Sequence, residues 1–109
     1  GSLTLGENIA DHGGLQVSYH AFKKAMETAP LEVVDGFTPE QRFFLAYANV
    51  WAGNIRPEEI LRLTKLDPHS LGKWRVDGAL PHIANWYEAF NITEQDSMFV
   101  PKEKRVSIW

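Results

Sequence analysis

The sequence contains no cysteine, which excludes disulfide bonds, thiolate catalysis and cysteine-ligated metals. It has no apolar run near the roughly 18–20 residues that cross a bilayer, and no charged-then-apolar leader. It also lacks a long run of charge: 14 acidic and 11 basic residues give a formal net charge of -3. We therefore expect no nucleic-acid partner, and any metal site must use histidine, aspartate or glutamate.

Apolar side chains are plentiful by contrast. The chain has 109 residues, of which 44% are hydrophobic and 12% aromatic, enough to build the core of one small domain or part of one. The sequence begins with Gly1-Ser2, which are either native or left by cloning, and runs straight into a helix signal. We expect residues 1–109 to be a single fragment of a longer polypeptide.

Helical signals dominate the chain. Thr4 and Glu7 fit a capping box that opens a helix over residues 5–28, with an apolar stripe ending before Pro30. Asp35-Gly36 indicates a turn, and Thr38 with Gln41 forms a second capping-box pattern. It predicts a helix over 39–52 that is apolar on nearly every side, and therefore buried and central.

Three shorter helices are predicted beyond the central one. They cover residues 56–66, about 70–80 with Ser70 as cap, and 81–90, followed by an irregular tail over 98–109. In the helix over 81–90, the side chains expected to face the core are Ile83, Trp86, Tyr87 and Phe90. With no convincing strand pattern, no repeat and no linker, the predicted fold class is all-α, a compact helical array.

Two carboxylates stand four residues apart at the start of the first helix. Glu7 and Asp11 share one helix face, beside His12, and could simply be a capping Glu and a solvated Asp. Alternatively, one carboxylate ligates Zn²⁺ while the other orients a neighbouring histidine ligand. The remaining zinc ligands would come from elsewhere, because the histidines of this chain do not form an HExxH pair; they are His12, His20, His69 and His82.

A second candidate group lies near the middle of the chain. His69 and Arg75 could be a surface histidine and a stacking or ion-paired arginine, or two groups that stabilise an oxyanion in a cleft. Val50 and Trp51, at the end of the helix over 39–52, fit either the core or the wall of an apolar specificity pocket. Composition and spacing leave both pairs of alternatives open.

Taken together and in order, these residues resemble the carboxy-terminal part of the neprilysin-like zinc metalloendopeptidases, the family that includes endothelin-converting enzymes and bacterial endopeptidase O. The resemblance spans essentially the whole chain. It rests on Leu-Gly-Glu-Asn-Ile-Ala-Asp at 5–11 with Gly13-Gly14, Phe43-Phe44 through Val50-Trp51, Asn-Ile-Arg-Pro-Glu at 54–58, Asp-Pro-His-Ser at 67–70 through Arg75, and Trp109.

The resemblance implies a role for each candidate residue. Glu7 would be the third ligand of a single Zn²⁺, and Asp11 would hold a ligand histidine by a hydrogen bond. His69 would stabilise the transition state and Arg75 would bind a substrate carbonyl. Val50 and Trp51 would line the hydrophobic pocket that receives the residue after the scissile bond. The fold implied is the carboxy-terminal portion of a thermolysin-like catalytic domain.

The resemblance places the other two zinc ligands and the general-base glutamate in an upstream HExxH helix, which these 109 residues lack. The isolated chain is therefore expected to be inactive, and its partners would be a peptide substrate and the upstream part of the same polypeptide. Where animal members carry cysteines this chain has Ala52, Asn91 and Val106, which suggests a bacterial source. An exported location, periplasmic, lipid-anchored or extracellular, is implied only through the family, and a cytoplasmic one stays open.

Two other interpretations remain at this point. The chain could be a non-catalytic helical interaction module in which Trp86, Tyr87 and Trp109 form a partner-binding surface. It could also belong to a degenerate family member whose upstream helix has lost its histidines. Helices that would pack on a missing half leave apolar faces uncovered, so we expect the isolated chain to self-associate.

Overall fold

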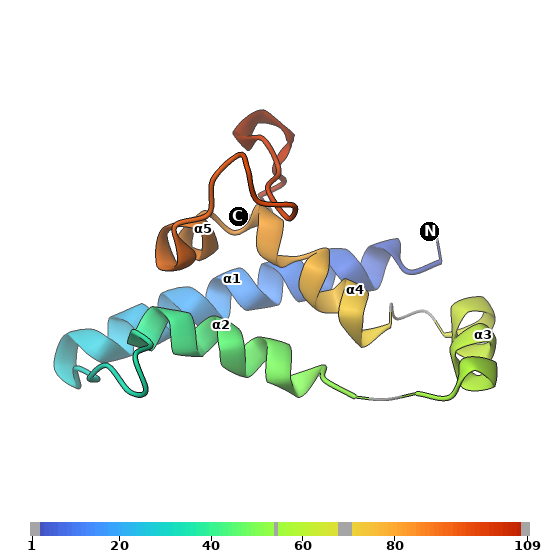
Figure 1. Cartoon of the computed structure of the whole chain (residues 1–109), viewed down its shortest axis with the longest axis horizontal. Coiled ribbons are helices and arrows are strands. Elements are labelled where there is room, and N and C mark those ends of the chain that lie inside the picture. The colour runs from blue at the N-terminus through green and yellow to red at the C-terminus, as the bar shows by residue number, and fades with distance from the viewer. Residues whose placement is uncertain (1–2, 54, 68–70, 108–109) are drawn as a thin grey trace.

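The computed structural model describes residues 3–53, 55–67 and 71–107. In this part of the chain the regular elements are helices, which confirms the all-α prediction (Figure 1). None of the described helices is both long and apolar enough to span a membrane. Gly1, Ser2, His69, Ser70 and Trp109 lie outside the described residues, so their predicted roles stay predictions.

The long helix α1 covers Leu5–Thr28, as the sequence predicts. The predicted capping box at its start is wrong. Thr4 has φ -100° and ψ -3°, which is already close to helical, and its side chain accepts no capping hydrogen bond. A capping residue normally needs an extended backbone to aim its hydroxyl at the first turn. The reciprocal capping box predicted for Thr4 and Glu7 therefore does not form.

The segment that follows α1 contains a tight turn. Val34 and Phe37 exchange two backbone hydrogen bonds, while Asp35 and Gly36 both have positive φ values of 53° and 80°. Helix α2 then covers Pro39–Val50, and Thr38 and Gln41 form the predicted capping box with both bonds present. The helix ends two residues before the predicted limit, because Trp51 leaves the helical conformation at the C-cap.

The rest of the chain forms short helices. These are α3 over Pro57–Leu66, α4 over Gly72–Asp77, the 3-10 turn η1 over Leu80–His82, α5 over Ala84–Phe90 and the 3-10 turn η2 over Lys102–Lys104. The helix predicted over 70–80 thus ends early, since Gly78 and Ala79 form a turn. The helix predicted from Pro81 likewise starts at Ala84. In Figure 1, α3 stands apart from the other helices, and none of its residues is buried.

The core lies where α1, α2 and α5 meet. Tyr19 of α1 stacks on Phe44 of α2 with ring centroids 5.2 Å apart, and Ile83 and Trp86 close the core from the α5 side. The prediction that α2 is buried on nearly every side is wrong. Phe44 is 1% exposed, but Leu45 is 41% and Val50 is 70% exposed. Within the described chain only one face of α2 has helices to pack against.

Candidate active site

An ion pair joins two candidate residues that are 64 positions apart. Arg75 of α4 donates from Nε to Asp11 Oδ2 at 2.6 Å and from Nη2 to Asp11 Oδ1 at 2.7 Å. The two side chains are only 15% and 17% exposed. The hydrogen bonds to Asp11 raise the pKa of Arg75, so the guanidinium stays charged, and Glu7 contributes to the same effect. The sequence suggested both residues separately, and the fold brings them together.

The last turn of α2 supports the same arginine. The guanidinium carbon of Arg75 lies 3.7 Å from the centroid of the Trp51 ring, a cation–π contact. The Tyr47 hydroxyl donates to the backbone carbonyl of Arg75 at 2.9 Å. Trp74, which precedes Arg75 in the sequence, does not take this place: its side chain is 57% exposed, and Lys73 lies over its ring. Arg75 is therefore held by both α1 and α2.

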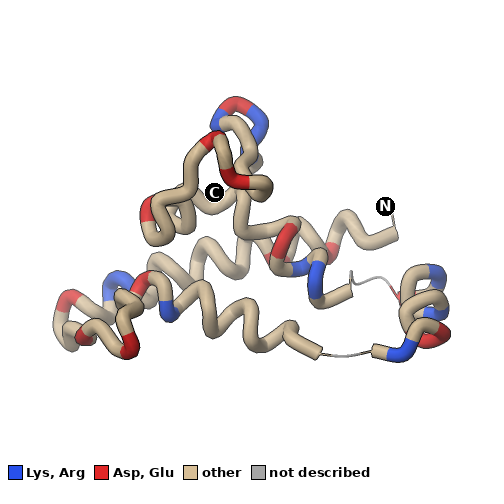
Figure 2. The backbone as a smooth tube through the Cα atoms, in the orientation of Figure 1, with Lys and Arg blue, Asp and Glu red and all other residues tan. Residues whose placement is uncertain are grey.

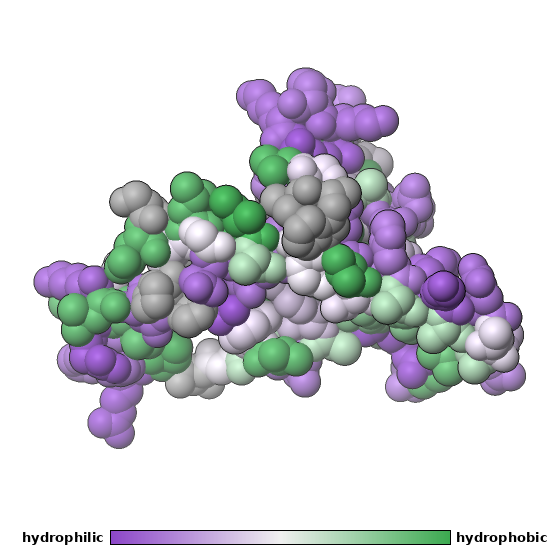
Figure 3. All heavy atoms as spheres, turned by 180° about the vertical axis from the view of Figure 1, so that it is seen from behind, coloured by the Kyte–Doolittle hydropathy of each residue, from purple (hydrophilic) through white to green (hydrophobic). Residues whose placement is uncertain are grey.

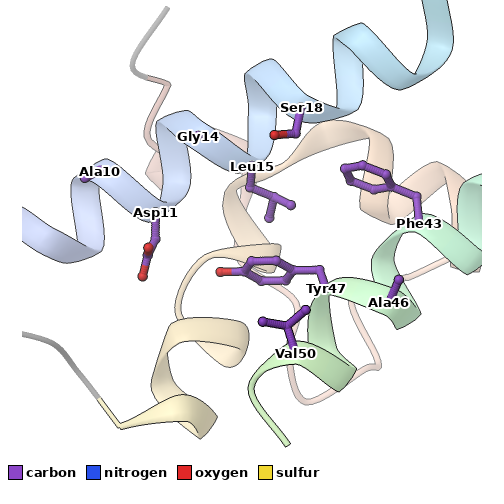
Figure 4. A pocket seen from close by; sticks show the side chains of 9 residues that line it. All are labelled: Ala10, Asp11, Gly14, Leu15, Ser18, Phe43, Ala46, Tyr47 and Val50. Carbon is purple, nitrogen blue, oxygen red and sulfur yellow. The ribbon is translucent and has the colours of Figure 1, made fainter. Parts of the chain in front are cut away.

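A groove of about 410 Å³ lies between α1 and α2, beside this ion pair. Figure 4 shows Asp11 and Leu15 facing Phe43, Tyr47 and Val50 across it. Most of the lining is apolar, and Figure 2 shows that the middle parts of both helices carry few charged residues. The remaining lining residues are small: Ala10, Gly14, Ser18 and Ala46.

The other predicted site residues occupy distinct positions. Glu7 is half-buried and lies one helical turn before Asp11 on α1. Val50 lines the groove, which shows that the core interpretation of this residue is wrong. Trp51 is half-buried beneath Arg75 and is not part of the groove lining. His69 lies outside the described residues.

The described residues fit a zinc ion only in part. They contain no group of three or more histidine, cysteine or acidic side chains that could hold a metal. Glu7 offers a carboxylate oxygen, which is a suitable zinc donor. Arg75 uses one lone pair on each Asp11 oxygen, and a carboxylate has about four such sites, so Asp11 can still accept a hydrogen bond from a ligand histidine. Glu7 and Asp11 therefore fit a zinc site completed by other ligands.

The structure corrects the interpretation of the chain as an interaction module. Trp86 and Tyr87 are only 5% and 8% exposed and belong to the core, so they do not form a binding surface. Their burial agrees with the separate prediction that they face inward from the helix over 81–90. Trp109 lies outside the described residues.

Sequence reasoning missed three features near the site. Tyr47 lies in the helix predicted to be buried on nearly every side, yet its hydroxyl reaches Arg75. Trp51 was assigned to the pocket wall or core, yet it stacks on Arg75. His12 and His82 lie with ring centroids 5.5 Å apart, although they are distant in sequence. An aromatic pair spaced four residues apart at the end of α2 was the available signal for the first two.

Two solved structures of one zinc metalloprotease share this arrangement of helices. The zinc metalloprotease Zmp1 of Mycobacterium tuberculosis, in its open state, matches with a TM-score of 0.93 and 37% sequence identity over 99% of this chain and 17% of that chain. Its structure in complex with inhibitor matches equally well, over 98% of this chain. A family model described as Peptidase family M13 matches residues 1–106, so the chain belongs to this family.

Curated relatives agree with this assignment. Human membrane metallo-endopeptidase-like 1 is 42% identical over 112 residues, which cover 100% of this chain and 14% of that protein. Human neprilysin is 40% identical over 113 residues, which cover 100% of this chain and 15% of that protein. The chain thus spans about one seventh of the length of these relatives, and the predicted resemblance to neprilysin-like enzymes is confirmed.

Proposed function

We propose that the polypeptide containing this chain is a zinc-dependent endopeptidase that hydrolyses internal bonds of peptides. This chain is the carboxy-terminal portion of its catalytic domain. Glu7 is the third zinc ligand and Asp11 orients a histidine ligand from the upstream HExxH segment. Arg75 binds a substrate carbonyl, and His69 assists in stabilising the transition state. Val50 and Trp51 belong to the site that receives the residue after the scissile bond.

The observation that carries this proposal is the two-point contact between Asp11 and Arg75. Asp11 presents both oxygens to Arg75, while Glu7 lies one turn away on the same helix. The ion pair between Asp11 and Arg75 does not by itself account for Glu7. Two like charges four residues apart on a helix repel, so a purely structural ion pair gains nothing from this second carboxylate. A cation between Glu7 and the ligands of another segment removes that repulsion and makes the spacing favourable.

Arg75 keeps hydrogen-bonding capacity for a substrate. A guanidinium has five N–H groups, and Asp11 occupies one on Nε and one on Nη2. The rest can donate to a peptide carbonyl, and such bonds gain strength from the fixed charge. When bound, zinc supplies Lewis acidity that polarises a carbonyl and lowers the pKa of water. The groove beside Val50 would receive an apolar side chain.

Source and location remain proposals that rest on the family. We propose a bacterial source, because the chain has no cysteines of the kind that bridge the animal members. We propose an exported protein through the family alone, since a chain without cysteines gives no argument for an oxidising compartment. Cell fractionation with detection of this polypeptide would test the location. Recovery in the cytoplasm alone would contradict it.

The decisive test of the peptidase proposal is Glu7→Gln in the full-length polypeptide. It removes the ligand charge but keeps the side-chain size, so we expect loss of bound zinc and a fall in kcat/KM of at least about 100-fold. Zinc is measured by elemental analysis of the purified protein, and activity with an internally quenched peptide. Glu27→Gln, an exposed change at the far end of α1, is the matched control and should retain both.

The outcomes separate the alternatives. Retained zinc and activity in Glu7→Gln would contradict the ligand assignment. A wild-type polypeptide that binds no zinc and cleaves no peptide would favour the degenerate family member instead.

A further inference from the structure

The last turn of α2 carries two aromatic side chains that contact the same residue of α4. We propose that Tyr47 and Trp51 are positioning residues that hold Arg75 in the orientation that binds a substrate carbonyl. This inference rests on the proposed function, because it assigns Arg75 a substrate to bind. The inference goes beyond the proposed function because it gives Tyr47 a role and gives Trp51 a second role, that of orienting Arg75.

The first step concerns the freedom that the ion pair leaves. Asp11 fixes one edge of the guanidinium through Nε and Nη2, which leaves Nη1 on the opposite side of the planar group. Two parallel hydrogen bonds still allow the plane to tilt about the line that joins the pair. The Trp51 ring, 3.7 Å from the guanidinium carbon, supports the face of the group and removes this tilt. The unpaired edge is thereby fixed in direction.

The second step concerns the backbone of Arg75. Helix α4 ends at Asp77, and the last carbonyls of a helix have no partner within it. Ala79 donates to the carbonyl of Val76 rather than to that of Arg75. The Tyr47 hydroxyl fills the gap by donating to the Arg75 carbonyl at 2.9 Å. Tyr47 therefore fixes the main chain from which the arginine side chain extends.

The third step links the two aromatic residues. Tyr47 and Trp51 are four apart, so they lie on the same side of the α2 terminus. The Trp51 Nε1 is buried and makes no hydrogen bond of normal geometry with the described residues. Burial raises the pKa of Tyr47 and Asp11 raises it further, whereas Arg75 and the Trp51 indole act in the opposite direction. The two side chains therefore reach Arg75 from the same helix end, Tyr47 at the backbone carbonyl and Trp51 at the guanidinium.

The fourth step explains how α4 comes close enough. A Cβ atom on Gly72, the first residue of α4, would lie 2.5 Å from the backbone oxygen of Trp51. Only glycine permits this approach, which places Arg75, three residues later, over the Trp51 ring. The arrangement thus depends on backbone contact as well as on the ion pair.

The experiment compares Tyr47→Phe with Arg75→Ala and the double variant in the full-length polypeptide. Tyr47→Phe removes one oxygen and keeps the ring in the groove wall. If Tyr47 acts through Arg75, this variant should lower kcat/KM for a quenched peptide by about 5- to 30-fold, the effect of one lost hydrogen bond on a positioned group. In the Arg75→Ala background the same change should have less than about a twofold effect. Tyr19→Phe, a matched change in the core, should leave the kinetics within about twofold of wild type.

A second readout does not require activity. The emission of Trp51 is obtained as the difference between each protein and its Trp51→Phe counterpart. We expect Tyr47→Phe to shift this emission to longer wavelength, because Arg75 loses its bond to Tyr47 and covers the Trp51 ring less closely, which admits water. A wild-type polypeptide without peptidase activity would contradict the proposed function, but the emission measurement would still test the positioning role. Additive kinetic losses in the double variant, or unchanged Trp51 emission, would overturn the positioning role.

Discussion

His12 and His82 illustrate what individual residues contribute beside the residues proposed to act in catalysis. His12 is only 5% exposed, and its Nε2 has no hydrogen-bond partner among the described residues. His82 accepts a hydrogen bond at Nδ1 from the backbone of Val106, 2.9 Å away. Burial lowers the pKa of His12, and the nearby His82 lowers it further. Burial is also the main cause that lowers the pKa of His82, and the positive charge of Arg105 adds to it. Both imidazoles are therefore held neutral by the fold.

The pair should make the chain sensitive to acid. Because the folded pKa values lie below the ordinary value of 6.5, the unfolded chain binds more protons in mildly acidic solution. The two neutral histidines therefore contribute to the free energy of unfolding above pH 6.5, and this contribution is lost as the pH falls below 6.5. We expect the urea midpoint of the chain to drop between pH 7.5 and pH 5.5, and His12→Leu to reduce that drop. The control His20→Gln, at an exposed position, should show the full drop of the wild-type chain. A drop in His12→Leu as large as that of the wild-type chain would contradict the prediction.

At the scale of the elements, two similar sequence patterns have different outcomes. Thr38 and Gln41 form a full capping box at α2, with an extended backbone at Thr38, where ψ is 160°. Thr4 has the same pattern but a nearly helical backbone, so its hydroxyl does not cap α1. The sequence pattern is therefore necessary for a cap, but the direction in which the chain enters the helix decides whether it forms.

This difference gives a prediction about helix stability. Thr38→Ala removes a hydrogen bond to the Gln41 N–H, and should lower the free energy of unfolding of the chain by about 1 kcal/mol. Thr4→Ala, the control, should cost clearly less because it removes no capping bond. Both values come from chemical denaturation followed by circular dichroism. Equal losses in the two variants would show that the cap at α2 contributes nothing specific.

Alanine substitutions at two glycines, Gly14 and Gly72, test how closely α4 approaches α2. Alanine is the better helix former by about 1 kcal/mol, so Gly14→Ala in α1, where a Cβ meets open space, should stabilise the chain slightly. Gly72→Ala should instead destabilise it, because the new Cβ would lie 2.5 Å from the Trp51 carbonyl oxygen and push α4 away. Denaturant midpoints of the two variants measure the contrast. A stabilised Gly72→Ala would mean that α4 does not contact Trp51 in solution.

At the scale of the whole molecule, the chain is more extended than its length requires. Its radius of gyration is 15.3 Å, against about 13 Å for a compact domain of this size. Helix α3 contributes to this extension because it packs on no other helix through a buried residue (Figure 1). Figure 3 shows hydrophobic residues open to solvent on the rear face, and Val50, Leu66 and Val33 are at least 60% exposed.

These exposed residues lead us to predict self-association of the isolated chain. Monomeric proteins rarely leave such apolar surface open, and association buries it. Sedimentation velocity over a range of concentrations should show species larger than 12.4 kDa. Val17→Ser with Leu45→Ser, two exposed changes on α1 and α2, should weaken the association. A stable wild-type monomer at high concentration would contradict the prediction.

The sequence by itself determined the helical class, the bounds of α1 and α3, and the capped start of α2, because these depend on local spacing, proline and turn residues. It also indicated Glu7, Asp11, Arg75 and Val50 as candidate site residues, partly through the family resemblance. It misjudged the burial of α2, because periodicity shows that a face is apolar without showing whether another element covers it.

Only the tertiary structure decided which side chains meet. The contact of Arg75 with Asp11, Trp51 and Tyr47 joins three separate helices, and no local pattern specifies such a meeting. The approach of α4 to α2, which depends on Gly72, and the pairing of His12 with His82 are of the same kind. The physical reason is that these contacts depend on how helices pack across long sequence separations, whereas propensity and spacing act within a few turns.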